Sequence, residues 1–510
     1  MSELRYEQIP VHSVIADFRQ GKLVVPEFQR EYIWPANRAA KLVESLYHRF
    51  PISSLLVWET EDPIERRSDR PKPERNTPIG WLIDGQQRVI TLSRAEEGED
   101  NIDVAFNIDD ESFSRVNAAT EKDPRWVRVA DVWDEDWLRK YRKSLGDEPR
   151  DKRVEQRLEQ LKAVLGYPIP VVKMVGYDLA DAVEAFKRIN SLGVRLHDAD
   201  LRSAEIALEH AGFIRQEVAP FLRKLKSQGF GRIAATQLFW ACGFIAHPDG
   251  RNHTPLHDLD SKQVANAWRE TKRAVETATA LLAAELGIAD MSVLWSGNLL
   301  VPLIAYCGTV APKQRRPQEI AGWVAAAALR HRYSKSAGSH IDQDLKACRA
   351  ADPVGSLLRN LRASRSGLWA SAIDFETSIA DKSALLAMFI ACKNLGVKDL
   401  LTGGNLIARR DLDRHHIFPR SRIDSREAAD TLANIAFIAR DSNEAISDER
   451  PEVYLARIKS DVLSSQAIPL DRTLWTLDRA EQFWAARRKL IAESLNSFLK
   501  ASLPRRRRIG

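Results

Sequence analysis

Two adjacent histidines, His415 and His416, are the residues of this chain best suited to chemistry. Side chains alternate along a strand, so in extended backbone the two imidazoles point to opposite faces and can do different work. A neutral imidazole ligates divalent metals, and a group that titrates near neutral pH can take a proton from water. The pair therefore predicts one metal ligand and one general base. The alternative is a pair of partly exposed loop histidines before Pro419.

Two asparagines follow at spacings that would complete such a site. Asn434 opens an apolar stretch that predicts a strand over 434–438. Asn443 comes directly after Asp441 and Ser442, which favour the start of a helix. Together with the histidines, the order is strand, loop, strand and helix. Two alternatives stay open, namely that Asn443 only caps a helix and that Asn434 only satisfies strand-edge amides.

The run Asp413-Arg414-His415-His416-Ile417-Phe418-Pro419, followed by these asparagines, resembles the HNH or ββα-metal nuclease motif in the form in which Asn replaces the final His. The resemblance implies that His416 is the general base and that Asn434 accepts a hydrogen bond from its other ring nitrogen. It also implies that His415 and Asn443 ligate one Mg2+ or Mn2+, which neutralises the scissile phosphate and the departing 3′ oxygen. Asp413, on the same strand face as His415, is a further candidate for the metal site, as a partner behind the ligands.

A second set of polar residues lies near the start of the chain. Residues 79–83 predict a strand, Asp84-Gly85 a sharp turn, and Gln86-Gln87-Arg88 the first turn of a helix. A helix start offers free amides to an anion, and Arg88 adds a planar donor fork for phosphate. Each feature alone is ordinary, because Asp-Gly is a common turn and Arg88 can pair with a structural carboxylate.

The sequence Ile83-Asp84-Gly85-Gln86-Gln87-Arg88, with a later Phe186-x-x-x-Asn190-x-x-Gly193, resembles the ParB/sulfiredoxin-like N-terminal domain of the GmrSD family of modification-dependent restriction enzymes. By motif, the resemblance covers roughly residues 5–210 and 395–460. It implies a pocket without a Walker A loop that binds or hydrolyses a nucleoside triphosphate, which is GTP, UTP or ATP. The residues that the resemblance assigns to this pocket are Asp84, Gly85, Gln86, Gln87, Arg88, Arg30 and Asn190.

Composition limits the alternatives. The net charge of +6 is modest for 510 residues, but Lys and Arg gather around the histidines and at 505–508, where the run is either a solvated tail or a DNA-contacting arm. The four cysteines are far apart and include no CxxC pair, which argues against a disulfide framework or a zinc knuckle. No apolar run approaches the length of a membrane span and the first residues do not form a leader, so we expect a soluble, cytoplasmic protein without a membrane partner.

The expected fold class is α+β and multidomain. Residues 1–225 would form the ParB/sulfiredoxin-like nucleotide-binding α/β domain, 226–395 a helical connector, and 396–510 an HNH domain with a C-terminal helix and basic tail. A strand is expected over 168–175, and 62–78 reads as an exposed insertion. Apolar residues at helical spacing predict helices over 151–165, 179–189, 199–210, 262–286, 319–333, 383–393 and 474–499.

The sequence therefore predicts a defence endonuclease that cuts or nicks DNA, in particular modified phage DNA, through a one-metal HNH site controlled by a nucleotide-binding domain. A nucleotide-dependent DNA-binding regulator that does not cut is the main alternative, and a nuclease acting on RNA or host DNA is another. The DNA modification, the triphosphate, nicking versus double-strand cleavage, gating by nucleotide, and assembly into a homo-oligomer all stay open.

Overall fold

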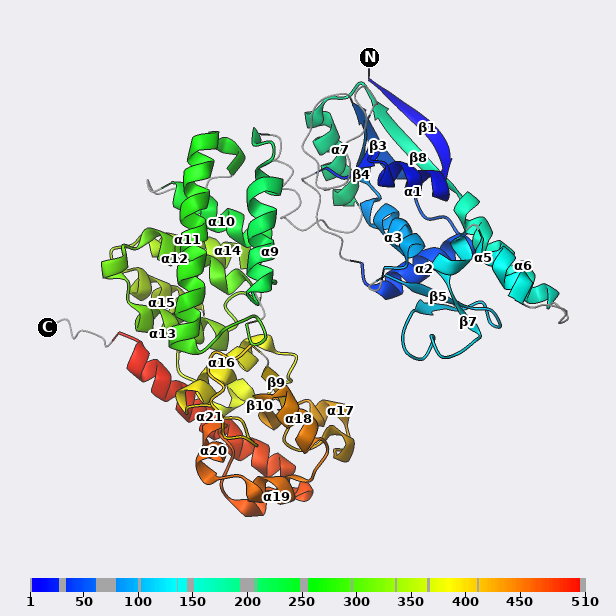
Figure 1. The fold of residues 1–510 in the computed structure, drawn as a ribbon. Helices are drawn as coiled ribbons and strands as arrows, with labels where there is room; N and C mark the ends of the chain where they lie inside the picture. Colours follow the sequence, from blue (N-terminus) through cyan, green and yellow to red (C-terminus); the bar gives the residue numbers. More distant parts are fainter. Residues whose placement is uncertain are drawn as a thin grey trace. The chain divides into compact units, whose positions relative to one another are not determined.

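The chain divides into two compact units, Met1–Val218 and Ala219–Gly510, each with its own core (Figure 1). The computed structural model describes residues 2–26, 34–60, 79–99, 102–134, 136–144, 151–192, 206, 209–247, 256–294, 297–334, 337–364, 367–410 and 412–504. The insertion expected over 62–78, Arg30, most of the helix expected over 199–210, and the terminal arginines lie outside the described residues.

The first unit is built on a mixed five-stranded sheet in the order β1-β8-β3-β4-β2 (Figure 1). Its strands are β1 Glu3–Pro10, β2 Leu23–Val24, β3 Leu55–Thr60, β4 Ile79–Asp84 and β8 Pro168–Val175. In β3, Leu55 and Val57 enter the core on one face of the sheet, and Leu56 and Trp58 enter the core on the other. The central strands are therefore buried on both sides, which explains their nearly continuous apolar sequence.

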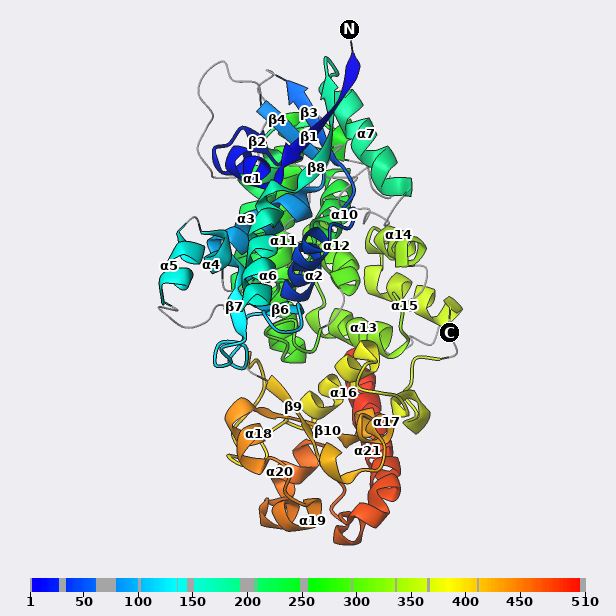
Figure 2. The ribbon, with the colours of Figure 1, turned by 90° about the vertical axis from the view of Figure 1, so that its right-hand side faces the viewer.

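Helices cover both faces of this sheet, and α1 and α7 lie on opposite sides of it (Figure 2). The helices that contribute to the larger core are α1 Val11–Arg19, α2 Ala36–Tyr47, α3 Gln86–Glu97, α4 Val129–Trp133 and α6 Lys152–Ala163. Helix α7, Leu179–Leu192, covers the other face through Val183 and Phe186. A small antiparallel sheet, β6-β5-β7, consists of β5 Val104–Asn107, β6 Phe113–Arg115 and β7 Trp126–Arg128, and α5 spans Trp137–Ser144.

The second unit begins with a helical part that leads into a ββα segment. Its helices are α9 Ala219–Ser227, α10 Ala235–Ala246, α11 Ser261–Leu286, α12 Leu300–Thr309, α13 Pro317–Leu329, α14 Ala337–Cys348, α15 Pro353–Ser364 and α16 Lys382–Asn394. The Asp260 side chain accepts a hydrogen bond from the Gln263 backbone N–H and so caps the long α11. No described helix combines the length and the apolar composition that crossing a membrane requires.

The ββα segment consists of β9 Leu412–His416, β10 Ile435–Ala439 and α18 Arg440–Ile446, with the short α17 Arg426–Ala429 between the strands. Helices α19 Pro451–Tyr454, α20 Ser460–Ser465 and α21 Ala480–Ser502 follow. Helix α21 packs along α16 and α13 (Figures 1 and 2). The segments expected to be a connector and a nuclease domain thus share one compact unit.

Most expected elements are confirmed near their predicted bounds, and the exceptions have local causes. The helix expected over 319–333 ends at Leu329, since His331 adopts a left-handed φ of 50°. The helix expected over 474–499 begins only at Ala480, because two short 3₁₀ turns precede it. The helix expected to begin near Asn443 begins at Arg440, so Asn443 lies inside α18 and does not cap it.

Candidate functional sites

Strands β9 and β10 present the two histidines to different environments. They pair antiparallel, with His416 opposite Ile435 and His415 opposite Ala436. As alternation along a strand requires, the neighbours differ in exposure: His415 is 2% exposed, whereas the His416 side chain is 24% exposed. The expected separation of the two imidazoles is therefore present.

His415 contacts one polar group through each ring nitrogen. Its Nδ1 lies 3.0 Å from Oδ1 of Asn443, and its Nε2 lies 3.3 Å from the hydroxyl of Tyr454. The Tyr454 hydroxyl has one proton and donates it to the Ile417 carbonyl at 3.0 Å. The tautomer of His415 decides the roles of its two contacts: a proton on Nδ1 is donated to the Asn443 oxygen, whereas a proton on Nε2 is donated to Tyr454 and leaves Nδ1 with a lone pair.

The amide of Asn443 is oriented by Asp413. Its Nδ2 donates to Oδ2 of Asp413 at 3.3 Å, so its oxygen is the atom that faces His415. Nδ1–H of His415 can donate to this oxygen at 3.0 Å in one tautomer. In the other tautomer, with the proton on Nε2, Nδ1 and the amide oxygen are both acceptors and could ligate one cation beside them.

The donor set suits a divalent metal in kind. Burial lowers the pKa of His415 to about 4, against the opposing effect of its Asn443 contact, so the imidazole is neutral at physiological pH. One neutral imidazole, one amide oxygen and one carboxylate are ligands for Mg2+ or Mn2+ when waters complete the shell. Among the described residues no cluster of three or more His, Cys, Asp and Glu could hold a metal, and this set reaches three residues only by including the amide.

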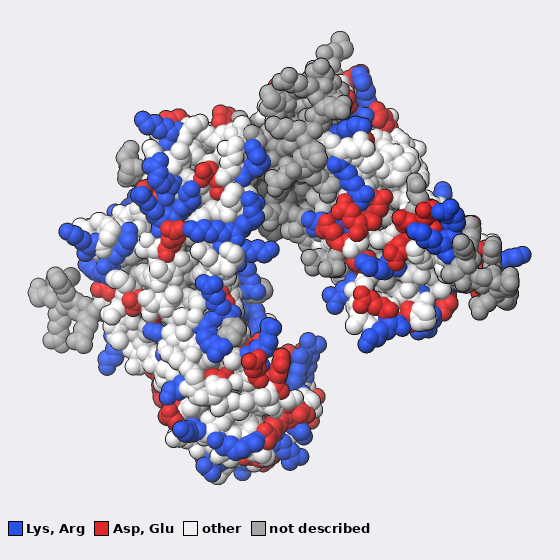
Figure 3. Space-filling view, in the orientation of Figure 1, with Lys and Arg blue, Asp and Glu red and all other residues white. Residues whose placement is uncertain are grey.

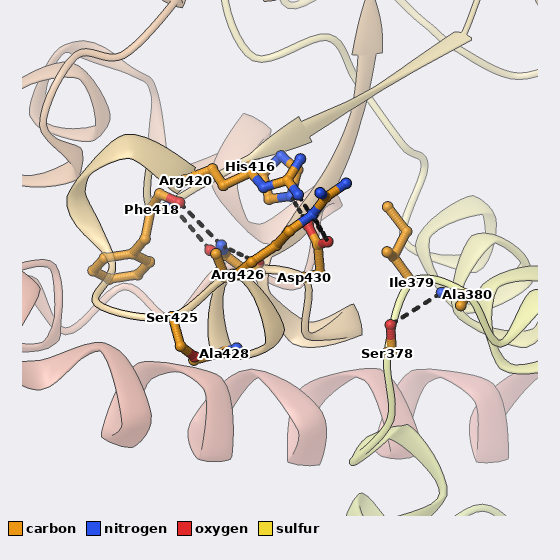
Figure 4. Close-up of polar contacts among 12 residues, drawn as sticks. Ser378, Ile379, Ala380, His416, Phe418, Arg420, Ser425, Arg426, Ala428 and Asp430 are labelled. Atoms are coloured by element: carbon orange, nitrogen blue, oxygen red, sulfur yellow. Dashed lines mark hydrogen bonds and ion pairs between the residues drawn. The ribbon is translucent and has the colours of Figure 1, made fainter.

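His416 has a carboxylate partner that the motif does not predict. Its Nε2 lies 3.0 Å from Oδ1 of Asp430, at the end of α17 (Figure 4). Arg420 and Arg426 approach the other oxygen of Asp430 at 3.5 and 3.8 Å. His416 therefore sits in a partly exposed charged cluster, on the opposite strand face from His415.

Asn434 does not bond to His416, so the expected hydrogen bond between them is wrong. Its fully buried side chain accepts from the Phe418 N–H at 2.9 Å and from the Trp484 indole at 3.3 Å. Its amide N–H groups donate to the carbonyls of Phe418 at 3.0 Å and Ala429 at 2.9 Å. These four bonds satisfy the side chain and fix the turn that directly follows His416.

Asp399 positions the helix that carries Asn443. It is fully buried and accepts hydrogen bonds from the Ala439 N–H at 2.8 Å and the Ser442 hydroxyl at 2.7 Å, at the first turn of α18. Burial is the largest single effect on the pKa of Asp399 and raises it. The hydrogen bonds from Ala439, Ser442 and Thr402 together outweigh burial, so the pKa lies below its ordinary value. The helix start is thus held by a carboxylate from a loop before β9, and Asp441 and Ser442 do not cap it themselves.

In the first unit, the expected strand-turn-helix is present as β4, Gly85 and α3. Gly85 has a φ of 96°, and a Cβ there would lie 2.3 Å from a Leu55 methyl group, so only glycine fits. Gln86 and Gln87 are both buried, and Oε1 of Gln86 has no hydrogen-bond partner among the described residues. The turn therefore brings Asp84 and the amide side chains together at the start of α3.

The guanidinium of Arg88 forms hydrogen bonds within the first unit. Its Nη1 donates to the carbonyls of Ile52 at 2.5 Å and Ser53 at 2.7 Å, and its Nη2 donates to the Ser54 carbonyl at 2.9 Å and to Asp84 at 3.0 Å. Burial lowers the pKa of Arg88, with Asp84 opposing. All four terminal N–H groups are occupied, so the expected free donor fork for phosphate is absent from this conformation.

A cavity of about 630 Å³ lies beside Asp84, at the ends of β3, β4 and β8. Met174 and Tyr177 contribute apolar surface, and Asp181 and Glu184 contribute further carboxylates. Of the other expected pocket residues, Arg30 lies outside the described residues. Asn190 falls within α7, on the element that lines the cavity, but its side chain is not described.

Three residues that hold the candidate site in place escape prediction from the motif: Asp430, Tyr454 and Asp399. Tyr454 meets His415, and Asp399 meets Ser442 at the start of α18, only through the fold. Asp430 offers a weak signal, as an acidic residue that ends a short helix four positions before Asn434. Such residues are common, so the pattern alone gives no reason to select it.

Comparison with known proteins identifies the first unit. Residues 11–207 match the family model for the GmrSD restriction endonuclease N-terminal domain, whereas a search of curated proteins finds no match. The matched range contains the five-stranded sheet except its first strand, and the turn from Asp84 to Arg88. The resemblance predicted from the sequence is thus confirmed for the N-terminal part of the chain: residues 11–207 are similar to the N-terminal domain of the GmrSD restriction endonuclease family.

Proposed function

We propose that this protein is a metal-dependent DNA endonuclease of phage defence, in which the ββα segment of the second unit cleaves phosphodiester bonds. The family of the first unit implies restriction of DNA. The finer assignment, an HNH-type active site on β9, β10 and α18, rests on the arrangement of His415, His416 and Asn443.

The contact between His415 and Asn443 carries the proposal. Ligands at adjacent corners of an octahedral ion with bonds of about 2.1 Å lie about 3.0 Å apart. Nδ1 of His415 and Oδ1 of Asn443 have this separation, 3.0 Å, and both would present lone pairs to an ion when the His415 proton is on Nε2. These two atoms would hold Mg2+ or Mn2+, and Asp413 would orient the amide from behind. When bound, the ion would neutralise the scissile phosphate and the leaving oxygen.

His416 would act as the general base. With Nε2–H donated to Asp430, its Nδ1 carries the lone pair, and Nδ1 has no hydrogen-bond partner among the described residues. This nitrogen would take a proton from a water molecule as the water oxygen attacks phosphorus, and the bond to the 3′ oxygen would break. Asn434 would support this step indirectly, because it fixes the Ile417-Phe418 turn next to the base.

Basic side chains around His416 would bind the DNA backbone. Arg414, on the same strand face as His416, is exposed, and Arg420 and Arg426 are 40% and 79% exposed. Lys and Arg also gather over the helical part of the second unit on the face shown in Figure 3. Contacts of this kind would make DNA binding weaken as salt rises.

The first unit would bind a nucleoside triphosphate, GTP, UTP or ATP, and use it to regulate cleavage. Support comes from the open N-terminus of α3, the unpartnered Gln86 oxygen and the adjacent cavity. In the cavity, the nucleotide would contact Asp84, Gln86, Gln87 and residues of α7 that include Asn190. Arg88 would shape the turn and would not contact phosphate, since its donors hold residues 52–54.

The test uses the full chain with plasmid DNA and with phage DNAs that carry base modifications or phosphorothioate links. Each substrate is incubated with Mg2+, Mn2+ or EDTA, with and without each triphosphate. We expect cleavage that EDTA and His416→Ala abolish and that the exposed-histidine control His48→Ala retains. Binding of DNA without cleavage under every condition would instead favour a nucleotide-dependent DNA-binding regulator.

A further inference from the structure

We infer that Asp430 is a positioning residue for the proposed nuclease reaction, which fixes the tautomer and the orientation of the His416 imidazole. The inference rests on the proposed function, because it assigns the partner of the general base. Nε2 of His416 and Oδ1 of Asp430 lie 3.0 Å apart, and both side chains are about a quarter exposed. The two therefore meet where the imidazole is partly open to solvent.

The carboxylate selects which ring nitrogen is basic. An ionised carboxylate only accepts hydrogen bonds, so Nε2 must carry the proton and Nδ1 must present the lone pair. Once Nδ1 has taken a proton from water, the ring would be cationic, and the adjacent carboxylate of Asp430 would stabilise it. An amide at the same position could present either an acceptor or a donor, so it would not fix the tautomer.

The backbone of Asp430 is held from outside the ββα segment. Its N–H donates to the Arg426 carbonyl at 2.9 Å within α17, and its carbonyl accepts from the Ile379 N–H at 2.9 Å. One residue further, Thr431 forms a β-bridge with Ser378. The segment before α16 thus fixes the backbone that carries the Asp430 carboxylate. In this way the helical part of the second unit helps to orient the base.

Two arginines share the carboxylate without displacing His416. Arg420 and Arg426 lie 3.5 and 3.8 Å from Oδ2, the oxygen that His416 does not use, whereas the His416 contact is the short one. Arg426 is mostly exposed, and pairs of this length in water contribute little to stability. Both arginines can therefore turn to a DNA phosphate while Asp430 keeps its bond to His416.

The test is a double-mutant cycle measured as cleavage of plasmid by the full chain. Asp430→Asn should lower kcat by about 100-fold and leave KM nearly unchanged, since general-base catalysis contributes about 10² to 10⁴ in rate. Asp430→Glu, which retains the carboxylate, should recover part of that loss. Combined with His416→Ala, the Asp430→Asn change should cost nothing further, because Asp430 acts only through the imidazole.

Asp424→Asn is the matched control, because it removes an exposed carboxylate from the same loop without a contact to His416, and it should cleave like the wild type. Additive losses in the double mutant, or wild-type rates for Asp430→Asn, would overturn the inference while the proposed function stands. An inactive wild type would instead count against the proposed function.

A spectroscopic readout decides the inference even if no substrate is cut. Nitrogen-15 NMR of the His416 ring in the metal-free full chain should show protonated Nε2 and unprotonated Nδ1. Asp430→Asn should mix or reverse the tautomers without changing the thermal unfolding midpoint by more than a few degrees. A wild-type ring protonated at Nδ1, or identical spectra for wild type and variant, would overturn the proposed role of Asp430.

Discussion

The imidazole of His415 and the amide of Asn443 face each other at 3.0 Å, although each is positioned by a different element. His415 is fixed from β9 through Tyr454, and Asn443 is fixed from α18 through Asp413. With the His415 proton on Nε2, both facing atoms are acceptors and could ligate one cation. The strand-to-helix junction thus holds the imidazole and the amide as close together as the proposed metal ion would require.

The amide of Asn443 should contribute directly to metal affinity. Asn443→Ala should weaken Mn2+ binding about 10- to 100-fold, by analogy with the loss of a group that supports a metal site. Asn443→Asp should bind Mn2+ at least as tightly as the wild type, because it supplies an oxygen and a negative charge. Calorimetry with the full chain measures both, and Glu444→Gln, an exposed neighbour on α18, is the control. Equal affinities for wild type and Asn443→Ala would exclude Asn443 as a ligand.

Asn434 should matter for stability as much as for cleavage. Asn434→Ala would leave the Phe418 N–H, two carbonyls and the Trp484 indole without partners in a fully buried place. Each buried polar group left unsatisfied costs about 1–3 kcal/mol, so the free energy of unfolding should fall by at least about 2 kcal/mol. Urea unfolding measures this change. A loss of less than about 0.5 kcal/mol, typical of a surface substitution, would contradict the role.

The motif predicted that His415 and Asn443 meet, but it predicted the wrong partner for His416 and not how these residues are held. Adjacent histidines on a strand must alternate, so the different environments of His415 and His416 follow from local geometry. Asn443 reaches His415 because a short β10 leads directly into α18. These relationships are short in sequence, and periodicity and turn chemistry are enough to predict them.

The partners of these residues depend on long-range packing. Asp399 reaches Ser442, and Tyr454 reaches His415, through the folding of segments that carry no recognisable pattern. The expected roles of Asn434 and Arg88 differ from the structure for the same reason, since each side chain found backbone carbonyls and amides in place of the predicted partner. Buried polar groups bond to whatever backbone the fold brings near, and a single sequence does not specify that.

The buried thiols should make the chain less stable at alkaline pH. Burial raises the pKa of Cys242 to about 12 and that of Cys392 to about 11, and both side chains are free thiols. Since the folded values exceed those of an unfolded chain, the folded state keeps protons that the unfolded state loses. The thiols' contribution to stability is complete below about pH 8.5 and is lost as pH rises toward the folded values.

The check is urea unfolding of the wild type and of Cys392→Ala between pH 8 and pH 10. The stability of the wild type should fall more steeply over this range, because the variant lacks one of the linked protons. Tyrosines and lysines titrate in both proteins and cancel in the comparison. Parallel curves for the two proteins would contradict the assigned shift.

Arg88 should support the fold of the first unit and not the binding of phosphate. Arg88→Ala would leave three backbone carbonyls, those of Ile52, Ser53 and Ser54, without their donor, and would leave Asp84 without its partner. We expect a loss of about 2–4 kcal/mol in the free energy of unfolding. Arg88→Lys should recover only part of it, since one ammonium cannot reproduce the planar fork. Arg139→Ala, in an exposed ion pair, should change little and is the control.

Triphosphate binding by the same variants separates the two roles of Arg88. Calorimetry is done at a temperature where circular dichroism shows Arg88→Lys to be folded. If the guanidinium only stabilises the turn, the dissociation constant of Arg88→Lys for the triphosphate should lie within a few fold of the wild-type value. The unfolding midpoint of this variant should still be lower than that of the wild type. A variant as stable as the wild type that no longer binds triphosphate would show that Arg88 leaves the carbonyls of residues 52–54 to bind the ligand. The free phosphate-binding fork predicted from the sequence would then be restored.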